Sequence, residues 1–342
     1  MAIELLRVME KGRGCKPDTP IYSMVIDSLC KDKMIDSALK LFDEMSEKDI
    51  TPNVVTYTAL ICGLCNWSLW RDAKMILKKM IDHKIYPDVL TFSTLVDALC
   101  KEGRMGEARN VFDSMASMNI APDVRSYSIL INGYCKKKKI DEAMHMFREM
   151  PRKGLLKPNI VTYNTVLQGL FRGGRCSEAL EIFEELQAVG LKPDFYTYCN
   201  MLDGLCRTKN LDQARIIFSD LASKGLEPNV VTYTIMIKGC CQNGLLDEAQ
   251  DLFQRMEEAN LSPNEITYNV IVRGNLKWGK YEAASKFLEE MDAKGFSPDA
   301  VTFELLLDSL DVKEHNSTVL KMFQKWAPST LNKNQRDKEL GM

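Results

Sequence analysis

One feature constrains the fold of this chain more than any other: a block of 35 residues that recurs along nearly its whole length. A Pro-Asp or Pro-Asn pair closes each block, and a Thr-Tyr pair or a close variant follows two residues later. The closing residues are Asn53, Asp88, Asp123, Asn159, Asp194, Asn229, Asn264 and Asp299. The spacing is 36 residues once, where Leu155-Leu156 stand for one residue elsewhere. Repetition at such a period predicts stacked units that contact only their neighbours.

We number positions from the residue after each closing pair. The complete repeats are then 19–53, 54–88, 89–123, 124–159, 160–194, 195–229, 230–264 and 265–299. Residues 1–18 match the second half of a unit. Residues 300–326 are predicted to form a degenerate capping repeat, in which Phe323 and Trp326 stand where Phe and Met occur in complete repeats. Residues 327–342 form a polar tail in the sequence. Although 342 residues would usually suggest two globular domains, the repeats predict one array without internal boundaries.

Each unit has the pattern of two helices joined by a short turn. In the unit 230–264, Val231 and Ile235 keep helical spacing, and Asn243-Gly244 is a turn signal. The acids Asp247 and Glu248 then suit the start of a second helix, where the helix dipole favours negative charge. Because one hairpin cannot bury its apolar face alone, we expect an all-α fold, a right-handed superhelical α-solenoid of stacked helix-turn-helix repeats.

Three positions are predicted to form the core. Position 20 is Ala in all eight repeats, which lets helices approach closely, and position 27 is always Met or Leu, a flexible filler. Position 12 is cysteine in six repeats: Cys30, Cys65, Cys100, Cys135, Cys206 and Cys241. One residue type that recurs at one helical position of stacked repeats is predicted to be buried.

The ends of the second helices carry a turn signal of their own. Seven of the eight repeats place Asn, Asp or Gly there: Asp49, Asn119, Gly154, Gly190, Gly225, Asn260 and Gly295. These residues tolerate the left-handed conformation that ends a helix, and Lys84 is the exception.

The sequence favours neither catalysis nor metal binding. Cys62 and Cys65 form a Cys-x-x-Cys pair, but no second pair stands at zinc spacing. His83, His145 and His315 fall at unrelated positions, so no catalytic triad can be assembled. A reactive thiol is conceivable at Cys15 or Cys199, and no pattern supports one. We expect a non-enzyme without cofactor or metal, and without a membrane span, since no run of about 18 apolar residues exists.

Charge is distributed in a way that leaves nucleic acid open as a partner. The net charge of −2 excludes a uniformly basic coat protein. Position 13, however, is basic in six repeats: Lys31, Lys101, Lys136, Arg172, Arg207 and Lys277. Such a stripe could follow phosphates, which predicts salt-sensitive affinity. The run Lys136–Lys139 is either a solvated turn or a further phosphate contact.

The repeats resemble pentatricopeptide repeats. The resemblance rests on the stretch Val-Val-Thr-Tyr-Thr-Ala-Leu-Ile-Cys-Gly-Leu-Cys at 54–65, on Asp-Glu-Ala at 141–143 and 247–249, and on the closing Pro-Asp/Asn pairs. Units of 35 residues throughout are similar to the P class, and Gly-Leu-Cys and Gly-Tyr-Cys endings to the restorer-of-fertility-like subgroup of plants. The tetratricopeptide repeat is a structural neighbour, but its period is 34 and its Trp/Leu-Gly/Tyr signature is absent.

The resemblance implies single-stranded RNA as the partner, with one base read per repeat by position 5 and the closing residue. The base-reading residues would be Ser23 with Asn53, Thr58 with Asp88, Ser93 with Asp123, Ser128 with Asn159, Asn164 with Asp194, Cys199 with Asn229, Thr234 with Asn264, and Asn269 with Asp299. Helix capping explains the closing Asp or Asn equally well. Capping does not explain why position 5, inside a helix, is polar in seven repeats.

The resemblance also assigns position 2, whose apolar residues would sandwich the base between adjacent repeats. These residues are Val55, Leu90, Val161, Tyr196, Val231 and Ile266. Pro20 and Arg125 depart from the pattern. The cations at position 13 would contact phosphates, except that Asn66 and Gln242 interrupt the stripe.

The pairing rule of the family predicts the RNA target. Ser or Thr with Asn implies adenine, Ser or Thr with Asp implies guanine, and Asn with Asp implies uracil. The pair Cys199 and Asn229 has no assignment. Along RNA from 5′ to 3′, the predicted target is 5′-AGGAUNAU-3′.

The expected function is sequence-specific RNA binding in organelle RNA metabolism, affecting transcript processing, stability or translation. The resemblance implies mitochondria before chloroplasts, although no transit peptide is visible in the sequence. A nuclease or another RNA-processing protein would act in trans, because residues 300–342 lack the His-x-Glu and Cys-x-x-Cys set of deaminase-like extensions. Two alternatives stay open: a protein-binding scaffold of the tetratricopeptide type, and a truncated, non-functional fragment.

Overall fold

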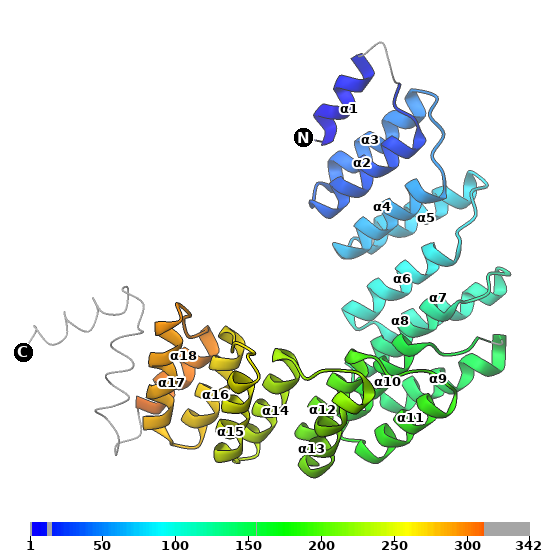
Figure 1. Cartoon of the computed structure of the whole chain (residues 1–342). Coiled ribbons are helices and arrows are strands. Elements are labelled where there is room, and N and C mark those ends of the chain that lie inside the picture. Colours follow the sequence, from blue (N-terminus) through cyan, green and yellow to red (C-terminus); the bar gives the residue numbers. More distant parts are fainter. Residues whose placement is uncertain (1, 12–15, 155, 311–342) are drawn as a thin grey trace, which may run out of the picture. The chain divides into compact units, whose positions relative to one another are not determined.

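The structure, a computed structural model, describes residues 2–11, 16–154 and 156–310. Throughout these residues the chain forms helices joined by short turns, with no β-strand (Figure 1). The expected all-α solenoid of helical hairpins is therefore confirmed. The chain divides into two compact units, Met1–Gly173 and Gly174–Met342. The division falls within the fifth repeat, and each unit is described by itself.

Every repeat supplies a first and a second helix. The first helices are α2 (Thr19–Lys31), α4 (Val54–Asn66), α6 (Val89–Glu102), α8 (Val124–Lys136), α10 (Ile160–Arg172), α12 (Phe195–Arg207), α14 (Val230–Gln242) and α16 (Glu265–Lys277). The second helices are α3 (Ile35–Glu47), α5 (Trp70–Asp82), α7 (Met105–Ser117), α9 (Ile140–Gly154), α11 (Cys176–Ala188), α13 (Leu211–Asp220), α15 (Leu246–Glu258) and α17 (Tyr281–Ala293). A short 3-10 helix, η1 (Ala222–Lys224), follows α13.

The partial units at the two ends are helical as well. Helix α1 (Ala2–Lys11) packs on α2, as a second helix preceding the first complete repeat would. Helix α18 (Ala300–Leu310) packs on α16 in the place of a ninth first helix. The expected cap residues Phe323 and Trp326 and the polar tail lie outside the described residues.

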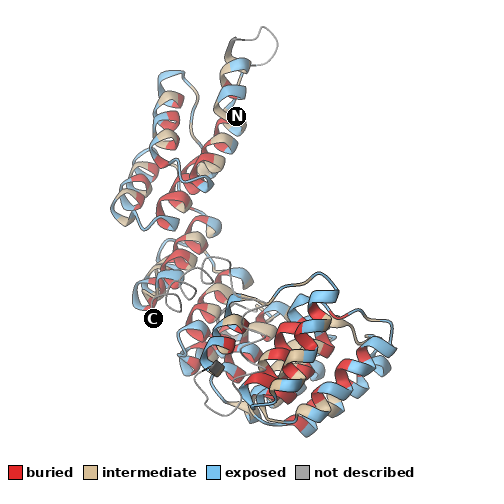
Figure 2. Ribbon diagram, turned by 90° about the vertical axis from the view of Figure 1, so that its left-hand side faces the viewer, coloured by how far each residue is buried: buried red, intermediate tan, exposed pale blue. Residues whose placement is uncertain are grey.

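Consecutive first helices stack on one another, and each second helix covers one side of the stack. In the first unit α2, α4, α6, α8 and α10 pack in that order, and in the second unit α12, α14, α16 and α18 do the same. Each helix therefore has one buried stripe and one exposed face (Figure 2). The first helices are buried on two sides by their neighbours in the stack, and their remaining faces are those left available to a ligand.

The predicted core positions are confirmed. All eight alanines at position 20, from Ala38 to Ala284, are at most 1% exposed, and so are all eight Met or Leu side chains at position 27, from Met45 to Met291. The six cysteines at position 12 are likewise buried. Six of the 11 cysteines and six of the 19 methionines in the sequence are thus accounted for by one buried position each, repeated along the array.

Aromatic pairs join six of the eight second helices to the next first helix. A Phe at position 24 meets the Tyr at position 4 of the following repeat edge to face, as Phe112 meets Tyr127 with ring centroids 4.9 Å apart. The same pair recurs as Phe42–Tyr57, Phe147–Tyr163, Phe183–Tyr198, Phe218–Tyr233 and Phe253–Tyr268. Such pairs contribute about 0.5–1.5 kcal/mol each beyond the area they bury.

In five repeats glycine at position 10 allows a close approach of consecutive first helices, whereas the third repeat has the buried Ala98 there. A Cβ added at Gly133 would lie 2.5 Å from Sγ and 2.9 Å from Cβ of Cys100, the position-12 cysteine of the preceding repeat. The same juxtaposition recurs at Gly63 with Cys30, Gly169 with Cys135, Gly239 with Cys206, and Gly274 with Cys241. The cysteine fills the space that the glycine leaves, so the two residue types at positions 10 and 12 are one packing device.

Six of the seven predicted left-handed residues follow the second helices in that conformation, whereas Gly154 is the last residue of α9. Asp49, Asn119 and Asn260 have φ between 56° and 58°, and Gly190, Gly225 and Gly295 are left-handed as well. Lys84 takes the same conformation with φ of 58°, although its side chain does not favour it. The geometry of the stack therefore prevails over the local preference of this residue.

Substituting Gly133 by Ala tests the packing device. The added methyl group must displace Cys100, so we expect Gly133→Ala to lower the free energy of unfolding by about 1–2 kcal/mol, after allowing for the higher helix propensity of Ala. Gly106→Ala is the matched control, because nothing lies within 4 Å of an added Cβ there. Urea titration followed by circular dichroism measures both, and equal midpoints for the two variants would contradict the packing account.

Candidate nucleic-acid interface

Large apolar side chains at position 2 project from the first turn of the first helices into solvent. Leu90 is the least exposed, at 46%, and Tyr196 the most, at 74%. The other four predicted residues, Val55, Val161, Val231 and Ile266, lie between these values. Pro20 and Arg125, which occupy position 2 in the remaining repeats, are exposed too. Within each of the two units, an exposed apolar side chain at the same place in successive repeats makes a periodic row suited to stacking against flat apolar groups.

Helix α18 extends this row by one position. Val301 stands at position 2 of the degenerate repeat and is 52% exposed. The sequence analysis did not single it out. The signal was present, because Ala300-Val301-Thr302-Phe303 repeats the opening of the complete repeats.

The closing Asp or Asn caps the first helix of the next repeat. In Asp88 the carboxylate Oδ1 accepts a hydrogen bond from the backbone N–H of Thr91 at 2.9 Å, and in Asn53 the amide Oδ1 accepts from the N–H of Thr56 at 3.1 Å. The same cap forms at Asp123, Asn159, Asp194, Asn229, Asn264 and Asp299. The capping interpretation of these residues is therefore confirmed.

Capping leaves the second atom of the closing side chain available. The Oδ2 of Asp88 and the Nδ2 of Asn53 take no part in the cap, and both side chains are exposed. Because the cap fixes Oδ1, it also fixes what the outer atom is: an acceptor in Asp and a donor in Asn. Capping and base reading are thus compatible. Asp299 differs, because its Oδ2 lies 3.4 Å from the guanidinium of Arg273.

The position-5 side chains lie deeper than a surface-reading role suggests. Ser23, Thr58, Ser93 and Asn269 are at most 7% exposed, and Ser128, Asn164, Cys199 and Thr234 are half-buried. In five repeats the position-5 hydroxyl contacts the position-3 hydroxyl of the next repeat: Ser23–Thr56, Thr58–Thr91, Ser93–Ser126, Ser128–Thr162 and Thr234–Thr267, at 2.7–2.9 Å. Position 5 therefore lies at the seam between two first helices.

Position 3 is the residue that the sequence analysis missed. Its Thr or Ser is 0% exposed in every repeat from the second onward, and in α18. The hydroxyl contacts both the closing residue and position 5 of the preceding repeat, as Thr91 does with Asp88 at 2.9 Å and Thr58 at 2.7 Å. The recurring Thr was visible in the sequence as part of the Thr-Tyr block, but its contact lies 33 residues away along the chain.

All six cations at position 13 are exposed. Three of them pair with an acid one turn earlier in their own helix: Lys31 with Asp27 at 2.6 Å, Lys101 with Asp97 at 2.7 Å, and Arg207 with Asp203 at 3.3 Å. Within the described part of the chain, Lys136, Arg172 and Lys277 make no ion pair. Exposed pairs of this kind contribute only about 0.3–0.5 kcal/mol, so a phosphate can compete for the paired cations at small cost.

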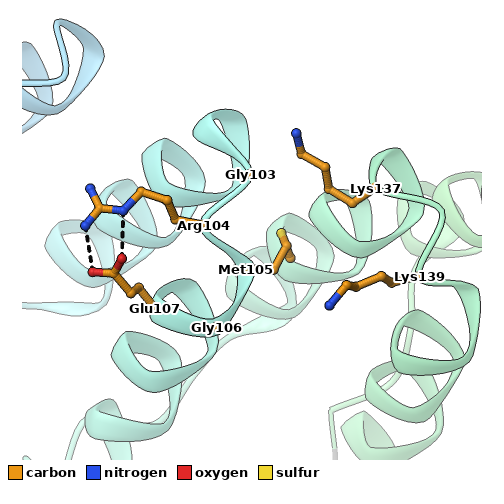
Figure 3. Close-up of a pocket in the computed structure, with 7 residues that line it drawn as sticks. All are labelled: Gly103, Arg104, Met105, Gly106, Glu107, Lys137 and Lys139. Atoms are coloured by element: carbon orange, nitrogen blue, oxygen red, sulfur yellow. Dashed lines mark hydrogen bonds and ion pairs between the residues drawn. The ribbon is translucent and has the colours of Figure 1, made fainter.

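The lysine run at the end of α8 forms a turn beside an open cavity. Lys137 ends the helix, Lys138 is left-handed with φ of 59°, and Lys137 and Lys139 line a cavity of about 530 Å³. Figure 3 shows both side chains extending toward the turn between α6 and α7, where Arg104 pairs with Glu107. The run is thus a solvated turn that presents two cations; its contact with phosphate stays a prediction.

The cysteines are buried and their thiols are hard to ionise. Burial raises the pKa of the thiols of Cys30, Cys65, Cys100, Cys206, Cys240 and Cys241 to about 12. Cys199 is half-buried, and burial followed by the charge of Asp194 raises the pKa of its thiol to about 11. Cys15 lies outside the described residues. Across the described ranges, no three His, Cys, Asp or Glu side chains form a group that could hold a metal ion.

The histidines take structural roles. His83 Nδ1 forms a 2.6 Å hydrogen bond with the hydroxyl of Tyr57, and His145 Nδ1 lies 3.5 Å from the carboxylate of Glu149. His315 lies outside the described residues. The two described histidines are on or beside second helices, away from the row of position-2 side chains.

Comparison with known proteins identifies the family. Models described as the PPR repeat family match residues 17–66, 87–136, 158–207, 200–242 and 228–277, and models of the PPR repeat match 55–85, 125–155 and 266–296. The chain belongs to the PPR, or pentatricopeptide, repeat family. The periodic caps and exposed position-2 side chains described above are therefore features of a PPR array.

Among solved structures, that of PPR10 agrees with the fold. The crystal structure of the maize PPR protein PPR10 in complex with an 18-nt psaJ RNA element has a TM-score of 0.51 and 23% identity over 90% of this chain. The chain spans about half (55%) of PPR10. Yeast Rmd9p in complex with a 16-nt target RNA has a TM-score of 0.48 and 12% identity, covering 95% of this chain and 84% of that one. A search of curated proteins gave no match. None of the described helices is long and apolar enough to cross a membrane.

The raised pKa of Cys199 predicts slow alkylation. Because only the thiolate reacts, its pKa of about 11 predicts that alkylation by iodoacetamide at pH 8 is at least about tenfold slower than that of an unburied cysteine in a peptide. The rate should continue to rise with pH beyond pH 9. Mass spectrometry of the labelled peptide measures it in the folded protein, with the urea-unfolded protein as control. A rate equal to that of the unfolded protein would show that the thiol is neither buried nor perturbed.

Proposed function

We propose that this protein binds single-stranded RNA in a sequence-specific manner, one base to a repeat. The observation that carries the proposal is a recurring pair at the start of the first helices: an exposed apolar side chain at position 2 and, two residues before it, a capping Asp or Asn. The capping side chain is exposed at Asn53, Asp88, Asp123, Asn159 and Asn264, and half-buried at Asp194, Asn229 and Asp299. The apolar side chain supplies a stacking surface for any base. The outer atom of the cap supplies a donor or an acceptor that distinguishes bases. A row of both kinds is suited to a strand with unpaired bases.

Different interactions would supply the affinity for RNA and the preference for particular bases. Stacking of a base on a protein side chain contributes about 1–3 kcal/mol when the side chain is aromatic, as Tyr196 is, and less on the branched aliphatic residues of the other repeats. The cations at position 13 add a salt-dependent term for the phosphates. Base preference then comes from the closing residue and position 5. We propose 5′-AGGAUNAU-3′ as the preferred sequence.

The proposed role is occupancy of RNA rather than chemistry on it. The described residues offer buried cysteines with raised thiol pKa and structural histidines, which suits a binding protein. A bound array would shield an RNA segment from nucleases or keep it unfolded, and so alter processing, stability or translation. We further propose an organelle, with mitochondria first, P-class membership of the restorer-like kind, and an RNA-processing partner acting in trans.

Exchanging one atom in the second repeat tests the proposal. Asp88→Asn retains the Oδ1 cap and converts the outer acceptor to a donor, so we expect the preference at the second base to change from guanine to adenine. Fluorescence anisotropy with 5′-AGGAUAAU-3′ and its three variants at the second base measures the preference at fixed salt. The order of the affinities for guanine and adenine at the second base should reverse, and their ratio should change by about tenfold, since a good base contact discriminates by about 1–3 kcal/mol.

The control for this experiment is Asp82→Asn. Asp82 is an exposed residue of the second helix in the same repeat, and its substitution removes the same charge away from the proposed surface. Both variants should gain a little affinity for every RNA through the lost negative charge. Only Asp88→Asn should change the order of the four bases. An unchanged order in Asp88→Asn would contradict base reading by the closing residue.

A further inference from the structure

We propose that the buried Thr or Ser at position 3 of each repeat is a positioning residue for the base-reading pair of the repeat before it. Its hydroxyl contacts the closing residue and the position-5 side chain at the same time, and thereby holds these two side chains in the arrangement in which they face RNA. The inference rests on the proposed RNA-binding function. It adds a residue that would touch no base and lies in the neighbouring repeat.

The geometry confines the position-3 hydroxyl completely. In the third repeat Thr91 is 0% exposed, and its Oγ1 lies 2.7 Å from Thr58 Oγ1 and 2.9 Å from Asp88 Oδ1. It also accepts a long hydrogen bond, 3.4 Å, from the backbone N–H of Asp88. A hydroxyl has one proton to donate. If Thr91 donates this proton to one of its two side-chain partners, any hydrogen bond with the second partner must be donated by that partner.

In the second and third repeats, which Asp closes, the proton has one destination. An ionised carboxylate only accepts, so Thr91 donates to Asp88, and Thr58 must then donate to Thr91. The base-reading pair of the third repeat is held in the same way by Ser126 of the fourth repeat. Ser126 donates to Asp123 at 2.6 Å, and Ser93 donates to Ser126. Neither Thr58 nor Ser93 bonds to a carbonyl of its own helix among the described contacts. The position-5 oxygen keeps both lone pairs. The eighth repeat differs, because Thr302 Oγ1 lies 2.8 Å from Asp299 Oδ1 and 2.6 Å from Asn269 Oδ1, and both oxygens only accept.

Where Asn is the closing residue, the position-5 hydroxyl makes a further bond. Ser23, Ser128 and Thr234 each donate their proton to the carbonyl four residues earlier, at 2.8, 2.8 and 2.6 Å. The position-3 hydroxyls of Thr56, Thr162 and Thr267 then have two acceptors for one proton: the position-5 oxygen at 2.7–2.9 Å and the Oδ1 of the closing Asn at 2.9–3.2 Å. The position-3 hydroxyl thus contacts both members of the pair, as it does where Asp is the closing residue.

Two identical side chains show the consequence. Ser93 and Ser128 occupy position 5 in successive repeats, yet the first has Asp123 and the second Asn159 as its closing residue. Ser93 makes its contact as a donor to Ser126, whereas Ser128 donates to the Val124 carbonyl. The Ser128 oxygen is then one of two acceptors for the proton of Thr162, and Asn159 Oδ1 is the other. The same serine is thus presented in two hydrogen-bonding states. This accounts for how one residue type can serve two different predicted bases.

The sixth repeat provides a natural control. Its position-5 residue is Cys199, and the hydroxyl of Thr232 bonds to the backbone carbonyl of Asn229 at 3.0 Å rather than to the Asn229 side chain. Thr232 still accepts from the backbone N–H of Asn229 at 2.9 Å, as a capping box requires. Removing its hydroxyl therefore costs a cap interaction of the same kind without breaking a link between two base-reading side chains.

The test replaces Thr91 by Val, which has the same shape without the hydroxyl. We expect Thr91→Val to lower the preference for guanine over adenine at the second base by about fivefold, the effect of losing one net hydrogen bond. The preference at the third base should be unchanged. Thr91→Ser should restore the second-base preference, because Ser126 performs this role in the fourth repeat. Thr232→Val should lose comparable thermal stability and keep both preferences.

Anisotropy with the four variants at each base separates the outcomes. If the wild-type protein binds all variants equally, the proposed function is wrong. If the wild type prefers guanine at the second base and folded Thr91→Val keeps that preference in full, the positioning role is wrong. Ser126→Ala, read at the third base, answers the same question in a second repeat if Thr91→Val does not fold. A loss of preference at all bases in either variant would indicate general damage and contradict the proposal.

Discussion

The structure depends on close packing between consecutive first helices. No single hairpin can bury its own apolar surface, so each first helix must be covered by the next one. Glycine at position 10 makes room, and the cysteine of the preceding repeat occupies it, as at Gly133 and Cys100. The same seam buries the hydroxyl at position 3, and a buried hydroxyl without partners would cost about 1–3 kcal/mol. The closing residue and position 5 provide those partners.

This requirement explains why structural and functional interpretations of the same residues do not compete. The closing Asp or Asn must accept from the N–H of position 3 to begin the next helix, and that bond fixes the orientation of its outer atom. In five repeats the position-5 hydroxyl is a partner of the buried position-3 hydroxyl, and in the sixth repeat, where Cys199 stands, a backbone carbonyl takes that place. A surface that can distinguish bases is thus formed from groups that the stack already needs. Position 5 varies mainly among Ser, Thr and Asn, whose side chains can form a hydrogen bond with the buried position-3 hydroxyl of the next repeat.

The sequence was sufficient for what depends on a single repeat and its period. The hairpins, the buried Ala38 and Met45 and their equivalents, and the left-handed Asp49 follow from spacing and residue type. The acid one turn before Lys31 was also visible, and so the partly paired charge of the stripe could have been predicted.

What could not be predicted lies between repeats. The contact of Thr58 with Thr91 spans 33 residues, and no helical periodicity indicates which of several polar side chains reaches across. The conformation of Lys84 follows from the stack and not from its own preference. The depth of position 5 was likewise not evident, since a polar residue in a helix is most simply placed at the surface. These features depend on how tightly two helices approach, which composition does not specify.

The central claim is that successive repeats bind successive bases with defined preferences. Selection of bound RNAs from a pool with eight randomised nucleotides, followed by sequencing, tests it most directly. The account predicts enrichment of two adjacent guanines preceded and followed by adenine, with little preference at the sixth nucleotide, where Cys199 and Asn229 stand. A bound pool without enrichment at any position, or an enriched motif that lacks the adjacent guanines, would contradict it.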